Sequence, residues 1–304
     1  MDAGAFRERD HMSVPEFCTD FYLAGLRVRV TAPREVPLDS NSRVFLRPSD
    51  AAPALWLRCE PVEKIALPPE AVALDVDRAV QITGSRVTRY ARVDAAAVPY
   101  LAASYDAASG AETLRVDCRV RADAWPWAAH TQRLWVAVSL AQLLLLRGRL
   151  VLHASYIRWQ GRGILFMAPS QTGKSTQARL WQAYRGAELI NGDKAVAEPQ
   201  AEGALAHSLP FCGTSGICRG ESTPLAAIVR LSQAPADRVE RLRPAQAAAA
   251  ILENAFAGRA VATEWQAAVQ LALQLAATTP VYHLACTPTA AAVDALQATL
   301  AADQ

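Results

Sequence analysis

The sequence lacks long hydrophobic runs, and this absence excludes several locations for the protein. Its longest apolar run, LWVAVSLAQLLLL at 134–146, is bounded by arginines and falls short of the roughly 20 residues that a membrane span requires. No apolar segment follows the charged start MDAGAFRERDHMSVPEF, so the sequence shows no secretory signal. We therefore predict a cytoplasmic protein that makes no membrane contact. The run is interpreted as a buried helix, with a short membrane-associated helix as the alternative.

Cysteine spacing and charge balance exclude further classes. The six cysteines form no C-x-x-C pair and no other metal-type spacing, which predicts free thiols in a reducing compartment. The 31 basic and 29 acidic residues nearly balance and are scattered along the chain. No basic surface for nucleic acid is indicated, and we expect no such partner.

The chain divides into two parts with different sequence patterns. Residues 20–122 consist of short alternating or β-branched stretches, such as LRVRVTA and ETLRVDCRVRA, which indicate strands. A Pro and Trp cluster at 123–130 precedes an expected helix at 131–147, and later strands alternate with helices at 174–185, 245–256, 264–277 and 289–301. This alternation favours an α/β layer structure. We predict a β-rich domain over residues 1–128 and an α/β domain over residues 129–304.

The strongest motif is FMAPSQTGKSTQARLW at 166–181. A strand, a turn and a helix opening with Lys174 and Ser175 fit the phosphate-binding pattern G-x-x-x-x-G-K-[ST], except that Ala168 replaces the first glycine. In such a loop, backbone N–H groups and the helix N-terminus face an anion. The chain has three lysines against 28 arginines, yet this position carries lysine, whose compact ammonium reaches between phosphates. A plain strand, turn and helix is the alternative.

Asp193 is the carboxylate expected to work with this loop. Loops of this kind hold Mg²⁺ through their Ser or Thr hydroxyl, here Ser175, and through a carboxylate at the end of a neighbouring strand. Asp193 follows the predicted strand AELIN and lies 19 residues after Lys174, as a strand, helix and strand unit allows. The alternative is that NGDK is only a turn.

The segment LHASYIRWQGRGILFMAPSQTGKST resembles the core of the HPr kinase/phosphorylase family and its relatives, including kinases found beside lasso-peptide and other modified-peptide gene clusters. In that family a histidine lies 21 residues before the loop lysine, as His153 lies before Lys174 here. The similarity covers about residues 150–235. It implies a P-loop-containing core like the HPr kinase C-terminal domain and phosphoenolpyruvate carboxykinase, joined here to a β-rich N-terminal domain.

The resemblance implies roles for individual residues. His153, Asp193 and Lys174 would be catalytic, with His153 close to the transferred phosphoryl group and Asp193 acting as metal ligand, as base, or as both. Ser175 and Asp193 would bind Mg²⁺. A satisfied core histidine is the alternative for His153. ATP would be held by the loop residues Ser170, Gln171, Thr172, Gly173, Lys174, Ser175 and Thr176.

The chain also departs from the family pattern. Gly192 precedes Asp193 where the family often has two aspartates, Gln171 replaces a loop glycine, and the family's arginine-containing glycine motif has no clear counterpart. The small residues of the CGTSG turn, Gly213 to Gly216, could line a phosphate or acceptor subsite, or form an ordinary loop.

The predicted function is ATP-dependent transfer of a phosphoryl group to a hydroxyl, with serine expected, of a protein or ribosomal peptide. The alternatives are an ATP-binding regulatory module without transfer activity, a small-molecule hydroxyl kinase, and, ranked last, a carboxykinase-type enzyme. The N-terminal domain is expected either to bind the substrate through strand edges or to support the core and a homo-oligomer.

Overall fold

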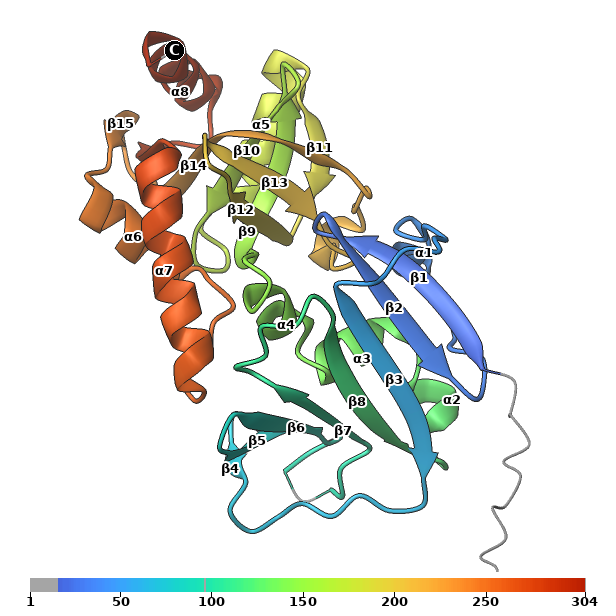
Figure 1. Cartoon of the computed structure of the whole chain (residues 1–304). Helices are drawn as coiled ribbons and strands as arrows, with labels where there is room; N and C mark the ends of the chain where they lie inside the picture. The colour runs from blue at the N-terminus through green and yellow to red at the C-terminus, as the bar shows by residue number, and fades with distance from the viewer. Residues whose placement is uncertain (1–15, 96, 304) are drawn as a thin grey trace, which may run out of the picture.

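Two β-sheets organise the part of the chain that the computed structural model describes, residues 16–95 and 97–303 (Figure 1). Each sheet has eight strands in this described part, and helices occur mainly after residue 124. The protein is therefore a mixed α/β structure, as the alternation of strands and helices indicated, and the HPr kinase-like core stays a prediction.

The first sheet is formed by the strands that precede residue 122. Its order is β1-β2-β3-β8-β7-β6-β5-β4, and neighbouring strands are antiparallel except for the pairs β2–β3 and β3–β8. Buried and exposed residues alternate along β8, as in a sheet with only one face on the core. The strands are β1 (Phe17–Leu23), β2 (Leu26–Ala32), β3 (Leu55–Val62), β4 (Val72–Ala73), β5 (Arg78–Thr83), β6 (Arg86–Ala91), β7 (Leu101–Asp106) and β8 (Leu114–Arg121).

The second sheet is partly closed on itself. Its order is β10-β9-β12-β13-β14-β16-β15, with β11 paired to β9, and β10 also pairs with β14. The strands β10, β9, β12, β13 and β14 therefore form a ring of hydrogen-bonded neighbours, in which only β10–β14 is parallel. The strands are β9 (Leu150–Trp159), β10 (Arg162–Met167), β11 (Glu188–Asn191), β12 (Lys194–Pro199), β13 (Ala204–Ser208), β14 (Ser222–Gln233), β15 (Arg238–Arg241) and β16 (Val281–Cys286).

Helices cover both faces of this second sheet. One apolar cluster joins the sheet to α5 and α8, and another joins its other face to α6 and α7. α5 has the bounds predicted for it, because it follows Gly173 and ends at Gly186, whose left-handed conformation (φ 64°) suits a helix C-terminus. The helices are α5 (Lys174–Arg185), α6 (Pro244–Glu253), α7 (Ala262–Thr278) and α8 (Ala290–Ala302), with a short 3₁₀ helix, η1 (Gly213–Ser215).

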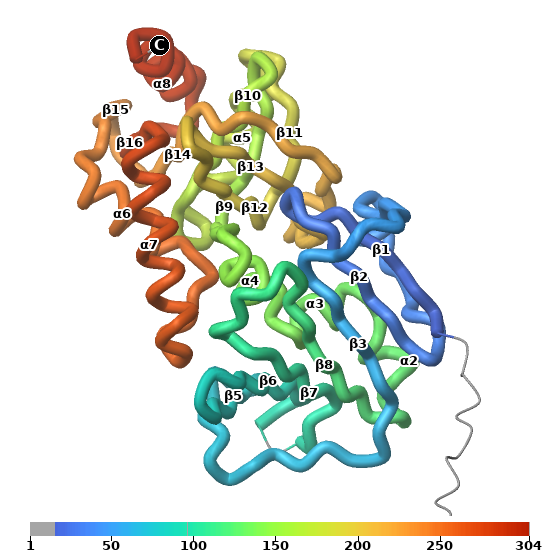
Figure 2. The backbone as a smooth tube through the Cα atoms, viewed as in Figure 1, coloured from blue at the N-terminus to red at the C-terminus, as the bar shows by residue number. Residues whose placement is uncertain are grey.

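The single helix expected at 131–147 is wrong, because the chain breaks it at Ser139 (φ 56°, ψ 58°). α3 packs on β6 and β7 of the first sheet, whereas α4 packs on β9 and α7 of the second. The break thus lets one apolar run cover two sheets, and Figure 2 follows the backbone through this connection. The short helices are α1 (Ser40–Arg43), α2 (Trp125–Ala128), α3 (Thr131–Ala137) and α4 (Leu140–Leu145).

The core of the first sheet continues into the second. Trp135 of α3 is fully buried and packs edge-on against Phe21, with ring centroids 5.1 Å apart. Val151 of β9 and Val196 of β12 belong to the same cluster. The division into domains at residue 128 stays a prediction, and residues 1–15 of the proposed first domain lie outside the described residues.

The apolar run and the cysteines lie as their sequence patterns suggested. The run is helical, with Leu134, Leu140 and Leu143 fully or almost fully buried. No helix in the described ranges is long and apolar enough to span a membrane. The six cysteines are free thiols.

Candidate active site

The predicted strand, turn and helix are present at residues 162–185. β10 is buried in the second sheet, and α5 begins directly after Gly173. The positive φ of Gly173 (119°) is one that glycine adopts without steric strain. Ala168, which stands where the motif has glycine, is fully buried and does not have a positive φ, so this departure causes no backbone strain. Within the loop, Gln171 also has a positive φ (66°), a conformation that side chains other than glycine rarely adopt.

Lys174 lies over the start of this loop. Its ammonium donates to the carbonyl oxygens of Ala168 (2.8 Å) and Pro169 (3.3 Å), and the residue is only 8% exposed. Burial lowers the pKa of Lys174, and the charge of Asp193 partly opposes that shift. The loop therefore curls around a cation held mainly by neutral carbonyl groups.

The N-terminus of α5 presents unpaired donors at the same place. The first bond within the helix runs from the N–H of Gln177 to the carbonyl of Gly173 (2.9 Å). The N–H groups of Lys174, Ser175 and Thr176 precede this bond and have no acceptor among the residues that the structure describes. Free N–H groups, a helix dipole and an ammonium at one point form an arrangement that favours an anion such as phosphate.

His153 and Asp193 come together across two strand ends. His153 Nε2 lies 3.4 Å from Asp193 Oδ1, and the N–H of Ala154 donates to the backbone carbonyl of Asp193 (3.0 Å). Burial lowers the pKa of His153; the positive charges of Lys174 and Lys194 lower it further, against the opposing charge of Asp193. His153 is therefore mainly neutral near pH 7, and the loop lysine lies within electrostatic range of both members of the pair.

Asn191 fixes the position of Asp193, a role that the sequence did not reveal. Its side-chain oxygen accepts from the N–H groups of Asp193 (2.9 Å) and Lys194 (3.0 Å). Its amide nitrogen donates to Ser208 Oγ (3.1 Å) and to the carbonyl of Leu209 (2.8 Å). Asn191 is fully buried, so this turn is anchored to the sheet from inside. The only signal in the sequence was the Asn-Gly pair, which indicates a turn.

The CGTSG turn packs directly against Asp193. A Cβ atom placed on Gly213, which has a φ of 54°, would lie 2.8 Å from Asp193 Cβ. A Cβ on Gly192 would lie only 2.1 Å from Ser215 Oγ and 2.5 Å from Ser215 Cβ. A side chain at position 192 would therefore clash with Ser215 in this arrangement, which accounts for glycine at this position.

The side chains near the loop offer oxygen atoms, which are the type of ligand that suits Mg²⁺. Mg²⁺ prefers oxygen ligands and is commonly bound by one or two carboxylates together with substrate phosphates and water. Ser175 is exposed at the start of α5, and the Asp193 carboxylate is 29% exposed. No group of three His, Cys, Asp or Glu side chains that could hold a metal occurs among the described residues. Any Mg²⁺ here would therefore need the phosphates of its nucleotide as further ligands.

Two cavities of about 580 Å³ each flank the outer side of the loop. One is bounded by Gln171, Gly173 and Gln177 on the loop side and by residues 286–288 opposite. The other is bounded by residues 169–172 together with Arg230 and His283. Both are large enough for a nucleoside, since ligand pockets usually hold about 300–1,000 Å³.

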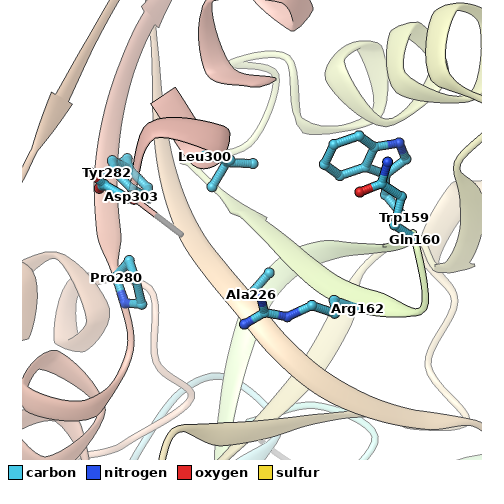
Figure 3. Close-up of a pocket in the computed structure, with 8 residues that line it drawn as sticks. All are labelled: Trp159, Gln160, Arg162, Ala226, Pro280, Tyr282, Leu300 and Asp303. Atoms are coloured by element: carbon cyan, nitrogen blue, oxygen red, sulfur yellow. The ribbon is translucent and has the colours of Figure 1, made fainter. Parts of the chain in front are cut away.

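A further cavity, of about 540 Å³, lies at the opposite end of the second sheet (Figure 3). It is lined by Arg162 at the start of β10, whereas the 168–173 loop follows the end of that strand. The hydroxyl of Tyr282 donates to Asp303 (2.5 Å) at its wall. Because β10 separates this cavity from the loop, it is not part of the candidate active site.

The structure thus places His153, Lys174, Asp193 and the exposed Ser175 around one end of the second sheet. The loop residues Ser170 to Thr176 surround the same point. Lys194 and Asn191, which were not among the predicted site residues, also belong to this neighbourhood. The roles assigned to all of these residues stay predictions.

Comparison with known proteins identifies a family. The family model described as SynChlorMet cassette protein ScmC matches residues 118–294, more than half of the chain, and the chain belongs to this family. No curated protein matches it. Among solved structures, the HPr(Ser) kinase/phosphatase from Coxiella burnetii is 12% identical, with 50% of this chain and 88% of that chain covered and a TM-score of 0.28. At that TM-score the likeness bears on neither fold nor chemistry.

Proposed function

We propose that this member of the ScmC family is a phosphotransferase that moves the γ-phosphoryl group of ATP to a hydroxyl of a protein or peptide. The observation that carries the proposal is the meeting of a buried ammonium, free helix N–H groups and the His153–Asp193 pair at one end of the second sheet. The resemblance of residues 150–235 to the HPr kinase/phosphorylase family supports the same reaction class.

The loop would bind the polyphosphate. Backbone N–H groups at the start of α5 donate to phosphate oxygens, and Lys174 exchanges its contacts with the Ala168 and Pro169 carbonyls for contacts with the β- and γ-phosphates. Ser175 and Asp193 would hold Mg²⁺, which neutralises charge on the phosphates when it is bound. These interactions position the nucleotide and stabilise charge that develops during transfer.

In the transfer step, Asp193 would act as the base. Its Oδ2 atom has no hydrogen-bond partner among the described residues, whereas Oδ1 faces His153. The acceptor O–H bond breaks with its proton passing to Asp193; a bond forms from the acceptor oxygen to the γ-phosphorus, and the bond from that phosphorus to the β,γ-bridging oxygen breaks. ADP leaves with the bridging oxygen, and the phosphorylated acceptor is the second product. Neutral His153 keeps the carboxylate oriented without neutralising it.

The experiment combines nucleotide binding with transfer. We expect the wild-type protein to bind ATP in the presence of magnesium and to add one phosphate to an acceptor, detected by mass spectrometry of proteins and peptides incubated with both. Lys174→Ala should lower turnover by about a hundredfold to a thousandfold, because a preorganised cationic donor is lost. Lys64→Ala removes a lysine charge at an exposed position after β3 and is the matched control.

The outcome also separates the alternatives. Saturable binding of ATP without phosphate transfer to any acceptor would favour the regulatory nucleotide-binding module, for which the single carboxylate at Asp193 provides a reason. Absence of nucleotide binding in the wild-type protein would refute both functions. Transfer that is undiminished in Lys174→Ala would remove the loop from the mechanism.

A further inference from the structure

A cavity of about 280 Å³ lies between the two sheets, beside the His153–Asp193 pair. Lys194 and two phenylalanine rings line it on the side of the second sheet, and Arg78 and Ser139 line it on the opposite side. Phe256 also packs edge-on against the His153 ring, with centroids 6.2 Å apart. The volume equals that of roughly nine liquid water molecules, so the cavity admits a side chain or the end of a peptide but not a folded domain.

Lys194 forms no ion pair with a described residue in this cavity, and the carboxylate that lines the cavity, Asp77, is paired with Arg78 (3.7 Å). Its Nζ atom lies 4.2 Å from the ring centroid of Phe211 and 4.7 Å from that of Phe256. No carboxylate oxygen of a described residue lies within the 4.0 Å limit of an ion pair with it. Burial lowers the pKa of Lys194, whereas the nearby charge of Asp193 raises it. A partly desolvated ammonium that only aromatic rings contact attracts an anionic ligand.

The position of Lys194 relates this cavity to the proposed chemistry. Lys194 directly follows Asp193 and is paired with His153 across strands β12 and β9. Paired residues on neighbouring strands point to the same face, with Cβ atoms about 5 Å apart. An anion held by Lys194 would therefore lie on the side of the sheet that carries the His153–Asp193 pair.

The cavity continues toward the outside of the molecule. An adjoining cavity of about 370 Å³ shares Arg78, Ser139, Gln142 and Phe256 with it, so the two form one groove between the sheets. At the outer part of this groove, exposed Arg259 stacks on Trp265, 4.7 Å from its ring centroid. No carboxylate among the described residues forms an ion pair with Arg259. By contrast, Arg78 and Arg89 in the same groove are paired with Asp75 and Glu264.

We infer that this groove, defined by the two adjoining cavities, binds the phosphoryl acceptor as a short acidic peptide segment. A carboxylate of the segment pairs with Lys194, its hydroxyl residue lies beside Asp193, and a second acidic residue reaches Arg259. A groove with an unpaired cation near each end fits an extended segment better than a small acid, which would occupy one cation only. The inference rests on the proposed function, because it assigns the acceptor of the same reaction.

The test uses three fluorescein-labelled hexapeptides with the cores Asp-Ser-Asp, Asn-Ser-Asn and Lys-Ser-Lys, all amidated at the C-terminus. Their binding to the full chain with magnesium and ADP is measured by fluorescence anisotropy. We expect the Asp peptide to bind about tenfold or more tightly than the Asn peptide, because a charged partner adds to each contact. In Lys194→Met the preference for the Asp peptide should shrink to the part that the Arg259 contact provides, whereas Lys64→Met should keep the wild-type difference.

Several results would overturn the inference. Equal affinity of the wild-type protein for the Asp and Asn peptides refutes an acidic acceptor, and this comparison needs no variant to fold. A preference for the Asp peptide that is undiminished in Lys194→Met places its carboxylate away from Lys194. Succinate that competes as tightly as the Asp peptide would assign the groove to small acids. Binding of magnesium and ADP, measured by calorimetry in parallel, tests the proposed function separately: its retention with failure of the peptide tests refutes the groove assignment alone.

Discussion

The two sheets differ in how their strands are buried, and the candidate site residues lie at one end of the sheet whose strands are buried on both faces. β8 of the first sheet alternates buried and exposed residues, whereas β10 of the second has five buried residues in succession. Helices on both faces of the second sheet cause this continuous burial. Such strands leave room for polar groups mainly at their ends, and Lys174 and Asp193 lie just past the ends of β10 and β11.

Buried charge follows the same division. Arg89 of the first sheet is 5% exposed and is fully paired, since it donates to Glu264 of α7 and to the Tyr105 hydroxyl (2.8 Å). Tyr105 in turn donates to Glu264 (2.6 Å). Buried Lys174 at the start of α5 instead contacts carbonyl groups, and partly buried Lys194 of β12 contacts aromatic rings. A satisfied buried charge stabilises the fold, whereas an unsatisfied one is available to a ligand.

The largest expected effect tests the chemical half of this comparison. Asp193→Asn should lower phosphoryl transfer by about 10²–10⁴-fold, because a general base contributes that much. Nucleotide affinity should fall much less than transfer, because the loop and Ser175 still hold the phosphates and Mg²⁺, and the urea midpoint should stay near wild type, since the amide keeps the shape of the carboxylate. Transfer rates from mass spectrometry and calorimetric titration give the two readouts. An unaltered rate would exclude Asp193 as the base.

The second prediction concerns the structural half. Glu264→Gln leaves the Arg89 guanidinium buried without a counter-charge and should lower the free energy of unfolding by about 3–5 kcal/mol. Urea denaturation measures this change. Arg238→Gln, which removes a mainly exposed ion-pair partner, is the control and should change little. A small effect of Glu264→Gln would contradict the view that this network joins the first sheet to α7.

The third prediction concerns a glycine whose replacement should affect both stability and phosphoryl transfer. Gly213→Ala places a methyl group against Asp193 and forces alanine into a left-handed conformation, at a cost of about 1–2 kcal/mol. We expect a modest loss of stability together with a larger loss of transfer, about tenfold, because Asp193 is displaced. Gly203 also has a positive φ (77°), but no neighbouring atom lies within 4 Å of a Cβ placed there. Gly203→Ala therefore measures the cost of the left-handed backbone alone and is the control. Equal rates in the two variants would show that the turn does not position Asp193.

The smallest effect is a dependence of stability on pH. The pKa of His153 is lower in the folded protein than its ordinary value of 6.5, so the unfolded chain binds this proton more readily. Stability should therefore fall as the pH decreases below about 6.5, and the loss should stop growing below the folded pKa. Urea midpoints of wild type and His153→Gln between pH 5 and 8 should diverge in that sense. Parallel curves would show that His153 is not perturbed.

Local sequence signals predicted the parts of the site that are contiguous in the chain. The helix at 174–185 and the strand before it follow from a glycine at each end of the helix and a buried run. The break at Ser139 could not be predicted, because it arises from the packing of α3 and α4 on different sheets. The strands β12, β13 and β15 were also missed.

The remaining features of the site depend on contacts between distant residues. Position 192 is restricted by Ser215, and the pairing of Lys194 with His153 depends on the register of β12 against β9. The anchoring of Asp193 by Asn191 depends on acceptors at Ser208 and Leu209. None of these contacts joins residues at a fixed and recognisable spacing in the sequence. The sequence therefore pointed to Asp193 as a candidate but not to the residues that position it.

The ring formed by β10, β9, β12, β13 and β14 determines which parts of the site are able to move. The loop at 168–173 leaves this ring after β10, and Asp193 lies directly before β12, which is part of the same ring. Separating them would require breaking strand pairs, so their spacing is fixed before any substrate arrives. The helices α3 and α4 and the first sheet, which line the proposed acceptor groove, lie outside this ring, so none of its strand pairs restrains them.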